Sequence, residues 1–190
     1  MSSGDRSTEP VAAPPQPPIF TIGHSTRTID EFVALLRVGE VEHVVDIRSV
    51  PRSRTNPRYN LDALPAELAR CQIAHTRIAE LGGLRRKSRT IAPEVNGFWI
   101  NQSFHNYADH ALSDEFRSGL ARLIDLSHDR RCAIMCSEAV WWRCHRRIVA
   151  DYLLWGGRAV FHLMGTHRVE PAALNEAARA WGGGLAYPAA

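Results

Sequence analysis

The stretch from Arg131 to Arg147, RCAIMCSEAVWWRCHRR, decides which fold this chain can adopt. It opens with an apolar run from Cys132 to Met135, which is typical of a buried strand. A polar loop with two tryptophans follows, and apolar residues then recur at helical spacing from Ile148 to Leu153. The pattern predicts a strand, a loop and a helix in immediate succession.

The loop between this strand and this helix is rich in reactive side chains. They are Cys136, Glu138, Arg143, Cys144, His145 and Arg146. A helix start presents free N–H groups and the positive end of a dipole, which favour anions and lower the pKa of a nearby thiol. Taken together, the cluster favours a functional site over a solvated basic face beside a buried cysteine. We expect Cys136 to face this site and Cys144, inside the helix, to turn toward the core.

Composition places the chain among ordinary globular proteins. Its 190 residues include 45% apolar and 23% charged residues, and the net charge of +3 is too small to predict nucleic-acid binding. The Pro- and Ser-rich residues 1–18 predict a disordered tail before a single domain over residues 19–190. With no signal-like or membrane-length apolar run, we expect a cytoplasmic protein with free thiols and no membrane partner.

Strand and helix patterns alternate along the rest of the chain. Apolar runs predict strands at residues 19–22, 44–47, 73–78, 132–135 and 159–163. Amphipathic patterns predict helices that include residues 30–38, 61–71, 114–126, 144–155 and 171–181. This order predicts a three-layer α/β fold with about five mostly parallel strands and helices on both faces.

Chemically distinctive residues follow the predicted strands. They are His24 and Ser25, then Asp46, Arg48 and Arg54, then Gly82 and Gly83, and finally Cys136 and Glu138. In a parallel sheet these positions meet at the carboxyl edge, where ligands bind. An irregular stretch from residue 84 to 101 carries the basic run Arg85–Arg89, which predicts either a lid over an anionic ligand or a solvated loop.

Several of these motifs carry a family resemblance. The segments Thr21–Ser25, Asp46–Ser49, Leu81–Gly83, Phe104–Asp109 and the pattern Cys136-x-Glu138 with Cys144-His145-Arg146 occur in the order seen in the domain-of-unknown-function 488 family. The chain resembles that family over roughly residues 19–165. The resemblance implies an α/β domain in which these motifs cluster, and it carries no settled activity.

A weaker resemblance links the chain to rhodanese-like domains. The layout of Val45–Arg48, a strand ending in Cys136, an arginine-bearing loop with Arg143 and a helix is similar to theirs. In those domains a cysteine after the strand is a nucleophile that takes up sulfur or, in phosphatase relatives, phosphate. The resemblance implies Cys136 as the nucleophile and Arg143 as its arginine.

Three function classes remain open from the residues. The first is a cysteine-dependent enzyme of sulfur or phosphoryl transfer, with His145 and the arginines activating Cys136 or Cys144. The second is a nucleic-acid or nucleotide-processing protein that uses Asp46 and Glu138 as acid/base or metal carboxylates. In that protein Arg48, Arg52 and Arg54 would hold phosphates, and Trp141 and Trp142 would stack on bases. The third is a non-catalytic anion or metal sensor that uses Cys136, Cys144 and His145. The absence of Cys-x-x-Cys spacing argues against a zinc knuckle, and adjacent Cys144 and His145 would diverge on a helix, which weakens shared ligation of one zinc, so we assign no metal ligands.

Overall fold

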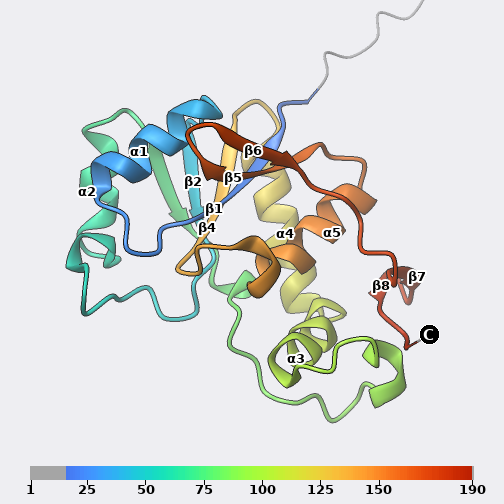
Figure 1. The fold of residues 1–190 in the computed structure, drawn as a ribbon. Helices are drawn as coiled ribbons and strands as arrows, with labels where there is room; N and C mark the ends of the chain where they lie inside the picture. Colours follow the sequence, from blue (N-terminus) through green and yellow to red (C-terminus); the bar gives the residue numbers. More distant parts are fainter. Residues whose placement is uncertain (1–15, 190) are drawn as a thin grey trace, which may run out of the picture.

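The computed structural model describes residues 16–189 and shows a six-stranded sheet with helices on both faces (Figure 1). The strands are β1 (Ile19–Gly23), β2 (His43–Asp46), β3 (Ala74–Arg77), β4 (Cys132–Cys136), β5 (Val160–Gly165) and β6 (Arg168–Pro171). Their spatial order is β3-β2-β4-β1-β5-β6, and only the pairing of β6 with β5 is antiparallel. The predicted three-layer, mostly parallel α/β fold is confirmed.

Five α-helices cover the sheet. They are α1 (Ile29–Val38), α2 (Leu64–Ala69), α3 (Gln102–Ala111), α4 (Asp114–Leu126) and α5 (Arg146–Trp155). Helices α1 and α2 lie on one face and α4 and α5 on the other, and α3 packs against α4 and α5 (Figure 1). Within the described residues, no helix is both long and apolar enough to cross a membrane.

Alternation along the strands divides the core into two layers. Val44 points into the cluster under α1 and α2, whereas its neighbour Val45 points into the cluster under α3, α4 and α5. Successive side chains of a strand face opposite sides, so a sheet buried on both faces needs continuous apolar runs. All five residues of β4 are buried, as the run after Arg131 predicts.

Local sequence signals set the helix starts. Thr28 caps α1 through a capping box with Glu31, and Ser113 caps α4 by accepting from the backbone N–H of Phe116. These caps satisfy N–H groups that the first helical turn leaves without partners. The helices predicted at 30–38 and 114–126 therefore begin directly after their capping residues, Thr28 and Ser113.

The prediction of a C-terminal helix at residues 171–181 is wrong. The chain instead leaves β6 at Pro171 and forms a small hairpin of β7 (Arg179–Trp181) and β8 (Gly184–Ala186). Asp151 of α5 holds this segment by accepting from the backbone N–H of Asn175 and from the Tyr187 hydroxyl. Tertiary contacts thus override an alanine-rich local pattern.

Only the end of the predicted disordered tail lies within the structure, because residues 1–15 fall outside the described part of the chain. Residues 16–18 carry no regular secondary structure. Two of them nevertheless contact the folded body: the carbonyl oxygen of Pro17 accepts a hydrogen bond from Arg158, and the Gln16 side chain bonds to His128. Within the described residues, contacts with the folded body therefore include residues just before the predicted boundary at residue 19.

The loop after β4 crosses directly over the end of β1. A Cβ atom at Gly23 would lie 1.8 Å from the carbonyl oxygen of Glu138, so only glycine allows this approach. The backbone N–H of His24 donates to the carbonyl oxygen of Cys136, which ties the two strand ends together. Because β4 lies between β1 and β2, the reactive loop is placed at the centre of the sheet edge.

Candidate functional site

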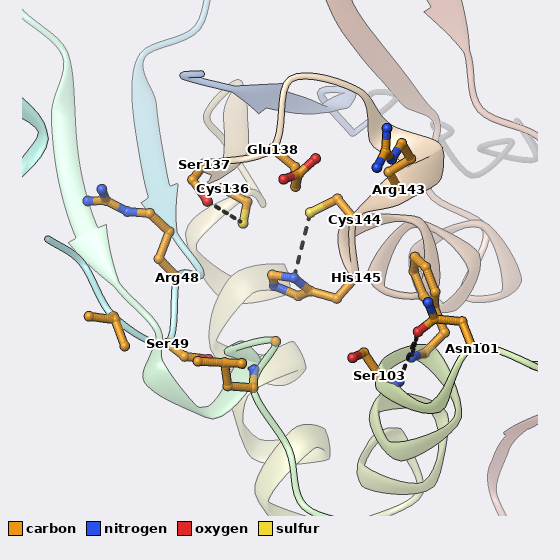
Figure 2. Close-up of a pocket in the computed structure, with 14 residues that line it drawn as sticks. Arg48, Ser49, Asn101, Ser103, Cys136, Ser137, Glu138, Arg143, Cys144 and His145 are labelled. Atoms are coloured by element: carbon orange, nitrogen blue, oxygen red, sulfur yellow. Dashed lines mark hydrogen bonds between the residues drawn. The ribbon is translucent and has the colours of Figure 1, made fainter. Parts of the chain in front are cut away.

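A cavity of about 500 Å³ opens at the carboxyl edge of the sheet (Figure 2). Seven of its lining residues were expected from the sequence: Arg48, Gly83, Cys136, Glu138, Arg143, Cys144 and His145. They come from the ends of β2 and β4, the segment after β3 and the residues just before Arg146, where α5 begins. A cavity of this size and position suits a small-molecule ligand.

Two thiols and one imidazole converge in the wall of this cavity. Figure 2 shows the sulfur atoms of Cys136 and Cys144 pointing toward each other above the ring of His145. The two sulfurs and a ring nitrogen all lie within 4.8 Å of one another, and Cys144 Sγ lies 3.6 Å from His145 Nδ1. The three reactive groups therefore form one cluster.

The expectation that Cys144 turns into the core is corrected by the local backbone. Cys144 follows the 3₁₀ turn Trp141–Arg143 in an extended conformation, and α5 begins only at Arg146. Because Cys144 and His145 precede the helix, the divergence of neighbouring side chains on a helix does not apply to them. Both side chains reach the cavity, although Cys144 is only 3% exposed.

The position and tautomer of His145 are set by its neighbours. Its Nε2 lies 3.1 Å from the carbonyl oxygen of Ile47, which can only accept, so Nε2 carries the proton. Nδ1 faces the sulfur atoms and lies 3.6 Å from Cys144 Sγ. Gly83 lies against the other side of the ring, where a Cβ would come within 2.4 Å of Nδ1. The glycine predicted as a binding residue thus makes room for the imidazole.

Arg146 distinguishes the two thiols electrostatically. Its Nε donates to Cys144 Sγ at 3.3 Å, and its Nη2 donates to the carbonyl oxygen of Glu138 at 2.6 Å. Burial opposes ionisation of Cys144, but a hydrogen bond from Cys136 and the charge and hydrogen bonds of Arg146 together lower its pKa to about 6. The same hydrogen bond, together with burial, raises the pKa of Cys136 to about 12. The pKa of Cys144 is thus shifted toward the thiolate form and that of Cys136 toward the thiol form.

Asp46 lies behind the cavity wall and does not line it. Arg48 donates to both of its carboxylate oxygens, at 2.9 and 2.6 Å, and also to the carbonyl oxygen of Tyr59. Burial favours the neutral carboxyl, but the hydrogen bonds and charge of Arg48 outweigh it and hold the pKa of Asp46 at about 2. In Figure 2 the guanidinium of Arg48 points away from the thiols. This buried ion pair supports the sheet edge.

His24 belongs to this supporting network and not to the cavity lining. Its ring stacks on Tyr59 with centroids 4.2 Å apart, and its Nε2 lies 3.4 Å from Arg48 Nη1. Burial is the main cause that lowers the pKa of His24 to about 4, so the ring is neutral near pH 7.

The other predicted residues divide between support and solvent. Gly82 packs against Ser49, and Ser25 adopts a left-handed turn conformation with φ of 48°. Arg54 is exposed in the loop after β2. Arg85 is anchored, because it donates to three backbone carbonyls and pairs with Glu115. The first residue of the basic run Arg85–Arg89 is therefore held against the body of the protein and is not part of a free lid.

Further lining residues were not expected as site residues. They are Ser49, Val50, Leu84, Asn101, Ser103, Phe104 and Ser137. Ser49 and Ser137 stand beside predicted site residues, so their positions after β2 and β4 were a usable signal. Asn101 caps α3 by accepting from the N–H groups of Ser103 and Phe104, which is a helix-start signal only. Asn101, Ser103 and Phe104 line the cavity because of the position of α3, which a helix-start signal does not predict.

The cysteine and histidine donors could also hold a metal ion. Two thiolates and one neutral imidazole are the ligand types that Zn²⁺ prefers, and a carbonyl partner on the second imidazole nitrogen is typical of such sites. The sequence predicts that Cys144 and His145 diverge on a helix, which argues against shared ligation. In the structure both residues precede α5, so that argument does not apply.

Comparison with protein-family models gives one match. Residues 28–153 match the family described as "Domain of unknown function DUF488". Comparisons with curated proteins and with solved structures found no match. The matched range contains Asp46, Gly83, the Cys136–Arg146 loop and most of α5, so the family model spans nearly all of the cavity's elements. The chain therefore belongs to the DUF488 family.

Proposed function

We propose that this protein is a cysteine-dependent enzyme in which the thiolate of Cys144 attacks an electrophilic sulfur atom. The observation that carries this proposal is the 3.3 Å contact between Arg146 Nε and Cys144 Sγ, in the wall of a cavity at the start of α5. A thiolate, and not a thiol, is the nucleophile, and a guanidinium beside the sulfur stabilises it. The nucleophile is thus Cys144, whereas the rhodanese resemblance implied Cys136.

Sulfur transfer is favoured over phosphoryl transfer by the charges around the cavity. A transferring phosphoryl group needs several cationic or N–H donors on its oxygens. Arg48 is neutralised by Asp46 and points away from the thiols, which leaves Arg143 as the lining cation closest in sequence to Cys144. The neighbouring Cys136 instead supplies a second sulfur group.

Nucleic-acid processing receives less support from the same contacts. Asp46 is held by Arg48 and is fully buried, so it is not available as an acid or base for a large substrate. Trp141, a predicted base-stacking residue, already stacks on His162 with centroids 4.3 Å apart and planes 9° from parallel. These contacts are compatible with binding of a small anionic molecule that contacts Arg143.

Alkylation by iodoacetamide tests the nucleophile. After treatment with a chelator, labelling of Cys144 should rise with pH around its pKa of about 6 and then level off, because only the thiolate reacts. Fast labelling should vanish in Cys144→Ser and persist, at pH values near 8, in Cys136→Ser. Cys71→Ser and Cys132→Ser serve as matched controls with the wild-type profile. Unchanged fast labelling in Cys144→Ser, or slow labelling of every thiol, would overturn the proposal.

A further inference from the structure

We infer that Cys136 is a resolving thiol, so that Cys136 and Cys144 together reduce the S–S bond of a small disulfide by two electrons. The inference rests on the proposed nucleophile Cys144 and names its substrate class and its partner group. What carries it is the placement of the two sulfurs within 4.8 Å of each other in the wall of one cavity.

The backbone around the two cysteines allows a disulfide between them to form and break. Cys136 ends β4, whereas Cys144 lies in extended backbone between a 3₁₀ turn and α5. Neither thiol is inside a regular helix that would hold its side chain away. A disulfide requires the sulfurs to approach to about 2.05 Å. Because the two sulfurs already lie within 4.8 Å of each other, we expect side-chain rotation in the cavity wall to bring about this approach.

The contacts of the two thiols suit an attacking and a resolving role. Arg146 Nε donates to Cys144 Sγ at 3.3 Å, and Cys136 Sγ lies within 4.8 Å of that sulfur and of a ring nitrogen of His145. When Cys144 is bonded to a substrate sulfur, Cys136 can give its proton to the neighbouring imidazole.

The reaction balances as two exchanges. The Cys144 thiolate attacks one sulfur of the disulfide RS–SR′, the S–S bond breaks, and R′S⁻ leaves and is protonated by solvent. Cys136 then gives its proton to His145, and its sulfur attacks Cys144 Sγ. The RS⁻ group leaves with the proton from the imidazolium. The substrate becomes two thiols, and the protein holds one new disulfide. An external dithiol reductant restores the protein by the reverse exchange.

The site accommodates a small disulfide. The cavity volume of about 500 Å³ lies within the range of small-molecule sites. Leu84 and Phe104 supply apolar walls, and Arg143 supplies a positive charge for a carboxylate-bearing disulfide. These features favour a compact anionic disulfide over a bulky folded partner.

The experiment uses 5,5′-dithiobis(2-nitrobenzoate), a carboxylate-bearing disulfide, on the full chain after chelator treatment. Cys71 and Cys132 are replaced by serine in every sample, because neither lines the cavity. The parent protein, which carries only the Cys71→Ser and Cys132→Ser replacements, should rapidly release two coloured thiolates per molecule and retain no adduct. Peptide mapping should then show a Cys136–Cys144 disulfide. Cys136→Ser should release one and retain the mixed disulfide on Cys144. Cys144→Ser should show no rapid release.

Contrary outcomes separate the two proposals. If the parent protein releases one thiolate and keeps the adduct on Cys144, the resolving role of Cys136 is wrong and the nucleophile stands. If release is equally rapid in Cys144→Ser, the proposed nucleophile itself is wrong. A folded state is verified for each variant by its cooperative thermal transition, so that loss of reaction is not loss of structure.

Discussion

The guanidinium of Arg146 bridges Cys144 and the loop after β4, because its Nε donates to the Cys144 sulfur while its Nη2 donates to the Glu138 carbonyl oxygen. Arg146 is 1% exposed and is the largest fully buried side chain of the described residues. The carbonyl that it holds is the same one that passes over Gly23. One buried cation therefore fixes both the ionisation of the thiol and the path of the loop that carries its partner.

Replacement of Arg146 by lysine should slow the reaction of Cys144. Lysine keeps the charge but lacks the planar fork that reaches the sulfur and the carbonyl oxygen together. The pKa of Cys144 should rise, and each unit of rise above the assay pH lowers the thiolate fraction about tenfold. The midpoint of the alkylation profile against pH should move to higher pH. Arg147→Lys is the neighbouring control, and an equal midpoint in wild type and Arg146→Lys would contradict the role given to Arg146.

Replacement of Gly83 by alanine should displace His145. The new methyl group would lie 2.4 Å from Nδ1, so the ring must move and its bond to the Ile47 carbonyl must weaken. Such overpacking costs about 1–3 kcal/mol of unfolding free energy. Urea unfolding measures it, and the second thiolate release from the aromatic disulfide should slow in parallel. Gly97→Ala is the control, since its nearest neighbours lie at 3.5 Å, and equal stabilities of the two variants would refute the contact.

Replacement of Asp46 by asparagine should reduce stability. Arg48 would keep its buried charge without a carboxylate, and breaking one partner of such a pair costs about 3–5 kcal/mol. In contrast, Asp129→Asn removes an exposed partner of Arg130 and should cost less than about 1 kcal/mol. Denaturant midpoints of the two variants measure the difference. A catalytic Asp46 would show the opposite pattern, with normal stability and lost reaction.

Asp151 should make stability depend on pH. Burial is the main cause that raises its pKa to about 6 in the folded chain, above its ordinary value of 3.8. The folded state thus binds the proton more tightly, so its contribution is full below about pH 4 and is lost as pH rises through about 6. The shift of about two units corresponds to about 3 kcal/mol at most. The difference in unfolding free energy between wild type and Asp151→Asn (wild type minus variant) should fall with increasing pH when it is measured across this pH range. A flat difference would show that the buried carboxyl does not titrate there.

Much of the architecture could be predicted from local patterns. The apolar runs at Ile19–Ile22 and Cys132–Met135 are strands because a strand covered on both faces needs such runs. The helix after Thr28 starts at its capping residue because the first N–H groups need acceptors. The alanine-rich residues 171–181 mislead by the same logic, since their local preference is overruled by the contact of Asn175 with Asp151 and by the pairing of Arg179–Trp181 with β8.

Local patterns were enough to predict that reactive residues follow the strands and gather at one edge of the sheet, because parallel strands end together. Which of these residues act as a unit depends on three-dimensional packing. Strand order places β4 between β1 and β2, and extended backbone at Cys144 turns this side chain toward Cys136. Which thiol ionises depends on a contact of 3.3 Å with Arg146, and electrostatic effects of this kind follow distance, which spacing along a chain does not specify.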